Sequence, residues 1–192
     1  MTSFRTFIAI DFPDTVIDKI KILQKSINGS YLSIIRWTKP DNIHLTLKFL
    51  GEVELEKIQL IEKSLDAIAN KTEPFNLNLA EIGAFPNWGH PRIIWIGLEN
   101  SEPLLSVAKE IEENLDKLGF QREIKPFSPH LTIGRVRDKT SYKDIQMLEN
   151  KCRTITRIKD RILIDNFYMY KSDLQPFGPV YTLLHSSSFK ST

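Results

Sequence analysis

The sequence predicts an α+β protein with two lobes, in which two pseudo-twofold-related, mainly antiparallel sheets face each other across a cleft and helices cover the outer faces. Three observations carry this prediction. Segments with a strand period alternate with segments that have a helix period along the 192 residues. Short turns join several of the strands, which favours antiparallel pairing. A strand, a helix and a strand with the motif His-Leu-Thr-aliphatic occur in each half, the motif beginning at His44 and again at His130.

The first half is predicted to contain strands that alternate apolar and polar residues, and helices with apolar residues every three or four positions. Asp14 or Thr15 is expected to cap the first helix, and Asn28-Gly29 to end it. In chain order we expect a strand at residues 4–11, a helix at 16–27, strands at 34–38 and 43–49 joined by a turn at 39–42, and a helix at 55–68. Gly51 is expected to end the strand that begins at residue 43.

The second half repeats this order loosely, with the same number of helices and two more strands. Ser101 is expected to cap one helix that Gly119 ends, and Ser141 with Asp144 resembles a capping box for the next. In chain order we expect a strand at residues 75–79, a loop at 83–91, a strand at 92–98, a helix at 101–118, a strand at 130–137, a helix at 141–152, and strands at 162–171 and 180–189 joined by a turn at 176–179.

The composition is that of an ordinary globular protein, with 41% hydrophobic and 26% charged residues. We therefore expect residues 1–192 to form a single bilobal domain. Cys152 is the only cysteine, which excludes an internal disulfide and favours a reducing compartment, and we expect it in the core near a helix end. The apolar run Phe7–Ile10 is too short for a signal peptide or a membrane span. The protein is thus predicted to be cytoplasmic, with no membrane partner.

Charge is distributed unevenly along the chain. The segment from Arg122 to Arg161 contains eleven Lys and Arg against five Asp and Glu, so its net charge is +6 and that of the remaining residues is −4. This asymmetry is compatible with an anionic, phosphate-bearing ligand near the second histidine motif, or with a solvated basic face that has no partner. The sequence has no glycine-rich phosphate loop, which disfavours an enzyme driven by a nucleoside triphosphate.

The repeated tetrapeptide carries the functional prediction. Only four histidines occur in the chain, and two of them open the motif. The strand period places His44 and Thr46 on one face and the intervening leucines on the other. Two imidazoles from two halves of a chain suit paired acid and base catalysis on a phosphodiester, which needs no protein nucleophile. Thr46 and Thr132 are then placed to donate hydrogen bonds to the phosphoryl oxygens, although threonine also favours strands in general.

These motifs and their flanks resemble the two-histidine (2H) phosphoesterases, and among them the RNA 2′,3′-cyclic phosphodiesterases that are also known as 2′-5′ RNA ligases. The resemblance spans nearly the whole chain and shows no departure at a motif position. The segments that carry it are Arg5–Ile10, Arg36–Thr38, Asn42–Glu52, Pro91-Arg92, Pro126–Ile133 and Tyr170–Ser172.

The resemblance implies hydrolysis of a terminal 2′,3′-cyclic phosphate on RNA to a 2′-phosphate, with no metal or other cofactor, and a weak reverse reaction that ligates RNA ends through a 2′-5′ bond. By analogy, His130 is expected to be the proton acceptor that activates water, with Thr132 helping to place it, and His44 the proton donor to the departing O3′. The expected partners are RNA ends with a cyclic phosphate, such as tRNA fragments, or small cyclic nucleotides. The protein is expected to be a monomer.

Arg135 is a further candidate for phosphate binding. It lies five residues after His130, which places it on the opposite face of an ideal strand. Only a bulge or the end of the strand would let its guanidinium reach the phosphate, and otherwise it is an exterior arginine.

Other side chains are expected around the cleft. Aromatic rings can stack on RNA bases, but rings at such positions more often serve core or loop packing. The remaining two histidines are interpreted as surface or structural residues. The stacking candidates are Phe49, Trp37 and Trp88, the candidates on the first strand are Arg5 and Phe7, and the two histidines without a catalytic role are His90 and His185.

Three alternatives stay open. A metal-dependent hydrolase would use His44 and His130 as ligands, but neither motif has an Asp or Glu positioned to join its histidine. A non-catalytic RNA or nucleotide-binding module would use the same pocket without turnover. A phosphodiesterase acting on a small cyclic nucleotide would share the chemistry but not the RNA substrate.

Overall fold

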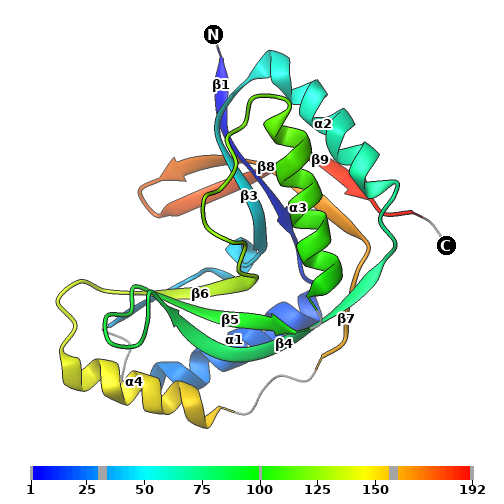
Figure 1. Cartoon of the computed structure of the whole chain (residues 1–192). Helices are drawn as coiled ribbons and strands as arrows, with labels where there is room; N and C mark the ends of the chain where they lie inside the picture. The colour runs from blue at the N-terminus through cyan, green and yellow to red at the C-terminus, as the bar shows by residue number, and fades with distance from the viewer. Residues whose placement is uncertain (1, 30–33, 100, 156–159, 191–192) are drawn as a thin grey trace.

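The computed structural model describes residues 2–29, 34–99, 101–155 and 160–190. Over these residues the chain forms a four-stranded sheet in the order β3-β1-β8-β9 and a five-stranded sheet in the order β2-β6-β5-β4-β7 (Figure 1). All the pairings are antiparallel, so the predicted α+β fold with two antiparallel sheets is confirmed. The elements are β1 (Ser3–Ile10), α1 (Asp14–Asn28), β2 (Ile35–Trp37), the 3₁₀ helix η2 (Pro40–Asn42), β3 (Leu45–Glu54), α2 (Leu55–Ala69), β4 (Phe75–Phe85), β5 (Ile93–Glu99), α3 (Glu102–Asp116), β6 (His130–Val136), α4 (Tyr142–Thr154), β7 (Ile162–Ile164), β8 (Asn166–Gln175) and β9 (Gly178–Ser188).

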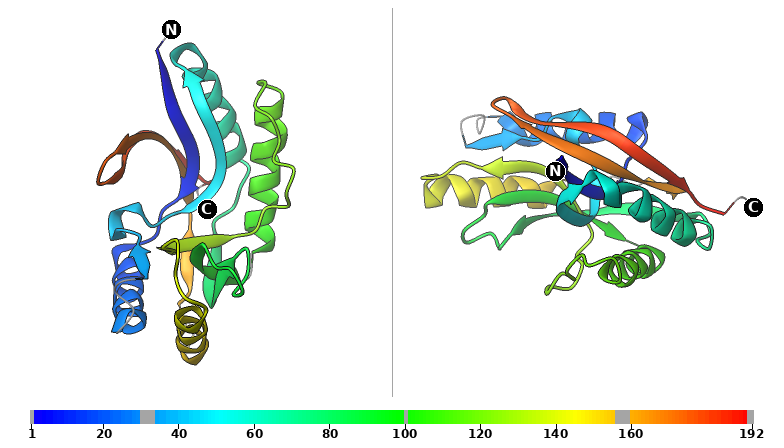
Figure 2. Two further views of the ribbon diagram at one scale, coloured as in Figure 1. Left: turned by 90° about the vertical axis from the view of Figure 1, so that its left-hand side faces the viewer. Right: turned by 90° about the horizontal axis from the view of Figure 1, so that it is seen from above.

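Helices cover the outer side of each lobe, as the sequence predicts. α2 and α3 pack against each other and against β3, whereas α4 packs against β4 and α1. The left view of Figure 2 shows the two lobes one above the other, with α1 and α4 at the bottom. Each helix buries one apolar stripe, such as Leu104, Ile111 and Leu115 of α3. None of the helices in the described ranges has the length and apolar character that crossing a membrane requires.

The two lobes exchange elements. α1 follows a strand of the four-stranded sheet but packs against α4 of the other lobe, and α3 follows a strand of the five-stranded sheet but packs against α2 and β3. β7 pairs with β4, and the next strand along the chain, β8, pairs with β1 of the other sheet. Because each lobe is built from both halves of the chain, this arrangement supports our expectation of a single domain.

The loop predicted at residues 83–91 begins later than expected. β4 continues to Phe85, and Gly83 lies inside the strand, paired with Trp95 of β5. A Cβ at Gly83 would lie only 2.2 Å from the nearest atom of the Trp95 ring. This glycine is therefore required for packing under an aromatic ring and does not mark a turn.

Several strand boundaries also differ from the prediction, including the predicted turn at 176–179, which is limited to Pro176 and Phe177 because β8 continues to Gln175 and β9 begins at Gly178. β3 does not close at Gly51 but continues to Glu54, because Gly51 adopts a φ of 70° beside an irregularity in the pairing with β1. The strand predicted at 162–171 is two strands that belong to different sheets and are separated at Asp165. The Asp165 carbonyl accepts a hydrogen bond of 2.7 Å from the backbone of Phe189, which fixes the point where the chain changes sheets.

The predicted N-terminal caps are only partly confirmed, since Ser101 occupies the N-cap position of α3 without a side-chain capping hydrogen bond. Ser141 accepts a hydrogen bond of 3.2 Å from the Asp144 backbone, which confirms the predicted cap of α4. At the start of α1, the capping position is Pro13, and neither Asp14 nor Thr15 caps the helix. Cys152 is buried near the end of α4, as expected, and burial raises the pKa of its thiol to about 12.

Candidate active site

His44 lies directly before β3 and is held between aromatic rings. Its imidazole stacks on the Phe7 ring at a centroid distance of 4.9 Å, and the Tyr181 ring meets it edge-on at 5.2 Å. A hydrogen bond to the Asn42 backbone fixes the ring further. The next strand residues alternate as predicted, since Leu45 and Leu47 are buried in the core. The imidazole is thereby oriented by the packing around it before any ligand binds.

His130 is the first residue of β6 and is held in a similar way. Its Nδ1 lies 2.7 Å from the Ser128 carbonyl, two residues upstream, as Asn42 is two residues upstream of His44. Because a carbonyl can only accept, Nδ1 carries the proton and Nε2 of the neutral ring is left as an acceptor. The Phe85 ring packs edge-on against the imidazole at 4.9 Å. Each motif therefore fixes its histidine by a backbone hydrogen bond and aromatic packing.

Both motif strands contain a bulge immediately after the threonine. β3 pairs Thr46 with Ala9 and the residue after Leu47 with Ile8, so Leu47 is the extra residue. β6 is irregular in the same way, with Ile133 as the extra residue opposite β5. A bulge reverses the alternation beyond it, so the fifth residue after each histidine returns to the histidine face. This is the bulge that the prediction for Arg135 required.

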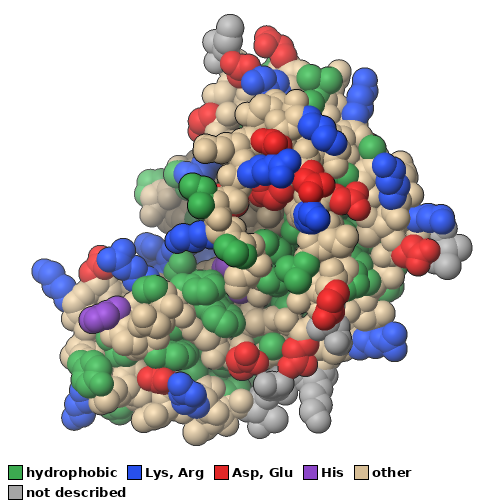
Figure 3. Space-filling view, in the orientation of Figure 1, with side chains coloured by type: hydrophobic (Ala, Val, Ile, Leu, Met, Phe, Trp, Pro, Cys, Tyr) green, Lys and Arg blue, Asp and Glu red, His purple; other side chains and the backbone are tan. Residues whose placement is uncertain are grey.

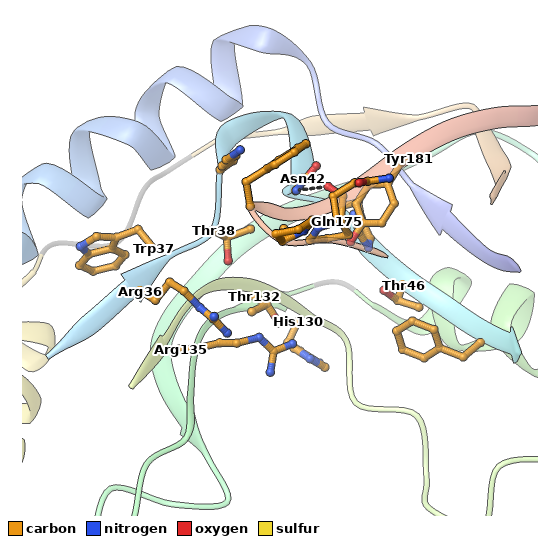
Figure 4. Close-up of a pocket in the computed structure, with 17 residues that line it drawn as sticks. Arg36, Trp37, Thr38, Asn42, Thr46, His130, Thr132, Arg135, Gln175 and Tyr181 are labelled. Atoms are coloured by element: carbon orange, nitrogen blue, oxygen red, sulfur yellow. Dashed lines mark hydrogen bonds between the residues drawn. The ribbon is translucent and has the colours of Figure 1, made fainter. Parts of the chain in front are cut away.

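The histidine faces of the two strands meet in one pocket of about 470 Å³. Figure 4 shows Arg36, Thr132 and Arg135 in the space between the two sheets and the β8–β9 hairpin, whereas the Trp37 ring is turned away from it and donates to Asn28 at 2.8 Å. The Asn42 side-chain amide donates a hydrogen bond of 3.1 Å to the Pro179 carbonyl, which ties this hairpin to η2. The lining residues are Arg36, Trp37, Thr38, Lys39, Asn42, His44, Thr46, Phe49, His130, Thr132, Arg135, Gln175, Pro176, Phe177, Gly178, Pro179 and Tyr181.

The pocket brings together seven of the predicted site residues, namely His44, His130, Thr46, Thr132, Arg135, Phe49 and Trp37. Phe7 is only 2% exposed, and its ring stacks on the His44 imidazole instead of lining the cleft. Arg5 is exposed on β1 and lies outside the lining, and Trp88 packs partly buried against the core. His185 is structural, because it lies 2.7 Å from Asp66 of α2, and His90 is exposed in the loop after β4.

Arg36, Lys39 and Tyr181 are lining residues that the sequence analysis did not assign. Arg36 and Arg135 are direct cross-strand partners in the β2–β6 pair, and Figure 4 shows their side chains close together. Like charges directly opposite one another on neighbouring strands are destabilising. Among the described residues, no acidic side chain lines the pocket and none pairs with either arginine. An anion between the two guanidinium groups would relieve this repulsion.

Burial sets the protonation of two pocket side chains. Desolvation lowers the pKa of His44 to about 4, against the opposing effect of the Asn42 hydrogen bond, so the imidazole is neutral at pH 7. Desolvation also raises the pKa of Tyr181, although Arg135 and Arg5 act in the opposite direction. Tyr181 therefore stays a neutral phenol that can donate a hydrogen bond at pH 7. Within the described ranges, no group of three His, Cys, Asp or Glu side chains is arranged to hold a metal ion.

Comparison with known families gives two matches to one model. The model described as LigT like Phosphoesterase matches residues 10–95 and, a second time, residues 96–181. The two matches begin 86 residues apart, which is also the separation of His44 and His130. The repeated family match therefore coincides with the repeated motif and with the repeated bulge.

Curated relatives cover nearly the full chain. The RNA 2′,3′-cyclic phosphodiesterase of Archaeoglobus fulgidus is 36% identical over 92% of this chain and 96% of its own length. The Methanocaldococcus jannaschii and Thermotoga maritima proteins of the same name are 36% and 34% identical over 94% and 97% of this chain, and the matches span 98% and 96% of those proteins.

Solved structures share the fold over the whole chain. A crystal structure of a Thermus thermophilus protein superposes with a TM-score of 0.83 at 26% identity, over 97% of this chain and 98% of that one. Escherichia coli LigT, crystallised with 3′-AMP, superposes with a TM-score of 0.78 at 24% identity, over 99% of this chain and 100% of that one.

Proposed function

The chain belongs to the LigT-like phosphoesterases of the 2H superfamily and is a cyclic phosphodiesterase, and on this basis we propose that it hydrolyses the terminal 2′,3′-cyclic phosphate of RNA to a 2′-phosphate through His44 and His130. The observation that carries the proposal is the meeting of two imidazoles, two threonines and two arginines in one pocket whose described lining has no acidic side chain.

His130 is the proton acceptor in this mechanism. Its Nε2 takes a proton from a water molecule that attacks phosphorus, and Thr132 helps to place that water. The bond between phosphorus and O3′ breaks as the new bond between phosphorus and the water oxygen forms. His44 gives a proton to O3′, so the product is a 2′-phosphate with a free 3′-hydroxyl. Each histidine ends in the protonation state opposite to its starting state, and exchange with solvent restores both.

The donor role requires His44 to be protonated when the substrate is bound. In the free protein its pKa is about 4, so the neutral form dominates at pH 7. A cyclic phosphate carries one negative charge, and an opposite charge within a few ångströms favours the protonated imidazole. We propose that substrate binding raises the pKa of His44 and so completes the acid. The threonine hydroxyls, the Tyr181 phenol and the Arg36–Arg135 pair would stabilise the charge that develops on the phosphoryl oxygens.

The reaction needs no metal in this proposal, since protons are moved by imidazoles and charge is balanced by arginines. Ligation through a 2′-5′ bond, in which an RNA 5′-hydroxyl attacks phosphorus in place of water, is proposed to be weak. One chain supplies both histidines, so a monomer is sufficient for activity. The single buried Cys152 keeps the cytoplasm as the proposed compartment.

The test uses an oligoribonucleotide that ends in a 2′,3′-cyclic phosphate, incubated with the protein in excess EDTA. We expect conversion to the 2′-phosphate, with a loss of about 10²- to 10⁴-fold in His44→Ala and in His130→Ala. His90→Ala, a histidine exposed outside the pocket, is the matched control and should retain full activity. A 3′-phosphate product, or a rate that neither substitution changes, would contradict the mechanism. Tight binding without turnover would favour the binding module instead.

A further inference from the structure

A second cavity adjoins the candidate active site. It has a volume of about 520 Å³ and lies between β3 and the segment that follows α3, and its lining is Phe49, Leu50, Gly51 and Phe120–Lys125. Phe49 lines this cavity and the 470 Å³ pocket with the histidines, so the two spaces share one wall. In Figure 1 the segment after α3 runs alongside β3 on its way to β6. Each cavity is within the size range of a small-molecule site.

The lining of the second cavity suits single-stranded RNA. The Phe49 ring is 59% exposed and is free to stack on a base, and Ile124 is 93% exposed at the rim. Lys125 supplies positive charge for a phosphate, and Arg122 adds a guanidinium whose Nε donates to Asp116 at 3.0 Å, with Glu123 as the one acidic side chain of the lining. In Figure 3, Lys and Arg side chains gather around the hollow between the lobes, whereas acidic side chains gather on the upper lobe away from it. Together these groups are suited to binding one phosphate and one base.

The wall of the second cavity is held in place by a buried lysine. The Lys48 side chain is 1% exposed, and its Nζ donates to Glu112 at 2.6 Å and to the Gln121 carbonyl at 2.9 Å. The Glu123 backbone also donates to Glu112, at 3.3 Å. These bonds anchor the segment after α3 to β3 beside Phe49. A site whose wall is already positioned loses less entropy when a ligand binds.

We propose that the second cavity binds the nucleotide on the 5′ side of the cyclic phosphate, so that the enzyme prefers an oligoribonucleotide to a mononucleoside 2′,3′-cyclic phosphate. The inference rests on the proposed function. A 2′,3′-cyclic phosphate closes the 3′ end of RNA, so the chain can continue only in the 5′ direction. The terminal nucleotide then occupies the histidine pocket, and its 5′ neighbour stacks on Phe49 with the linking phosphate near Lys125 and Arg122.

The experiment compares kcat/KM for a nucleoside 2′,3′-cyclic phosphate and for a dinucleotide with the same 3′-terminal group. We expect the natural protein to favour the dinucleotide by about tenfold or more, because stacking of one base contributes at that scale. Lys125→Glu should reduce this preference severalfold and leave the rate with the mononucleotide unchanged. Lys63→Glu makes the same change of charge on α2, outside both cavities, and should leave the preference intact.

Equal kcat/KM for the two substrates in the natural protein would overturn the inference while leaving the proposed function in place. The inference would also be overturned if Lys125→Glu lowered kcat/KM equally for both substrates. It would be overturned as well if Lys63→Glu reduced the preference for the dinucleotide as much as Lys125→Glu does. If the natural protein hydrolyses neither substrate, the proposed function fails and the inference fails with it.

Discussion

Replacing His44 with glutamine is expected to remove a pH dependence of stability that burial of this imidazole creates. Burial lowers the pKa of His44 from its usual value of 6.5 to about 4 in the folded protein. The unfolded chain therefore binds this proton more readily than the folded protein does, so the free energy of unfolding falls as the pH decreases from 6.5 towards 4. At pH 4.5 the loss attributable to His44 is about 2–3 kcal/mol relative to pH 7.5.

The measurement is urea denaturation, followed by tryptophan fluorescence, for the natural protein and for His44→Gln at pH 7.5 and 4.5. Carboxylates also titrate in this range, so the informative quantity is the difference in unfolding free energy between the two proteins. That difference should shift by about 2–3 kcal/mol in favour of His44→Gln at the lower pH. His90→Gln, at an exposed position, should show no such shift. A difference that stays constant between the two pH values would refute the argument that His44 is desolvated and neutral.

Three further predictions concern packing and charge. Arg36→Met removes the repulsion with Arg135 and should raise the free energy of unfolding by about 0.2–1 kcal/mol. The same substitution should lower kcat/KM for a cyclic phosphate. A decrease in both the free energy of unfolding and kcat/KM would contradict the proposal that the two arginines repel each other and together bind an anion. Asp66→Ala leaves two β9 side chains without their shared acceptor and should lower the urea stability by about 1–3 kcal/mol with kcat unchanged. Gly83→Ala forces a methyl group into the Trp95 ring and should lower stability by about 1–3 kcal/mol or more, and a melting temperature equal to that of the natural protein would show that the ring moves aside freely.

The sequence was sufficient to predict the sheets, the helices and the two motif strands because each has a clear period. It was also sufficient to propose the two histidines that meet in the pocket, since an imidazole and a hydroxyl at alternate positions are visible without a structure. Arg36 could not be found in this way. Its proposed role depends on a cross-strand partner 99 positions later in the chain, Arg135, and nothing in the local pattern around either residue identifies that register.

Two errors have the same physical origin, which is that tertiary packing overrides local signals. Gly83 is followed by a segment rich in proline and glycine, yet it belongs to a strand because the Trp95 ring occupies the space of its side chain. The apolar run at 162–171 looks like one strand, but Asp165 divides it between two sheets. Neither the ring nor the second sheet is close in sequence, so a local pattern carries no information about them.

The bulges explain how two equivalent strands contribute different side chains to the pocket. Leu47 and Ile133 are 86 positions apart, as are the histidines, so the irregularity is part of the repeated architecture. In each strand the bulge returns the fifth residue after the histidine to the pocket, but that residue is Phe49 in one lobe and Arg135 in the other. An aromatic ring is suited to a base and a guanidinium to a phosphate. In the proposed mechanism, exchanging the two is expected to keep both histidines in place and still misplace the substrate, because an RNA end is itself asymmetric across the scissile phosphate. We therefore propose that a symmetric backbone with asymmetric fifth residues gives the substrate one orientation, and that this orientation decides which histidine faces the water and which faces O3′.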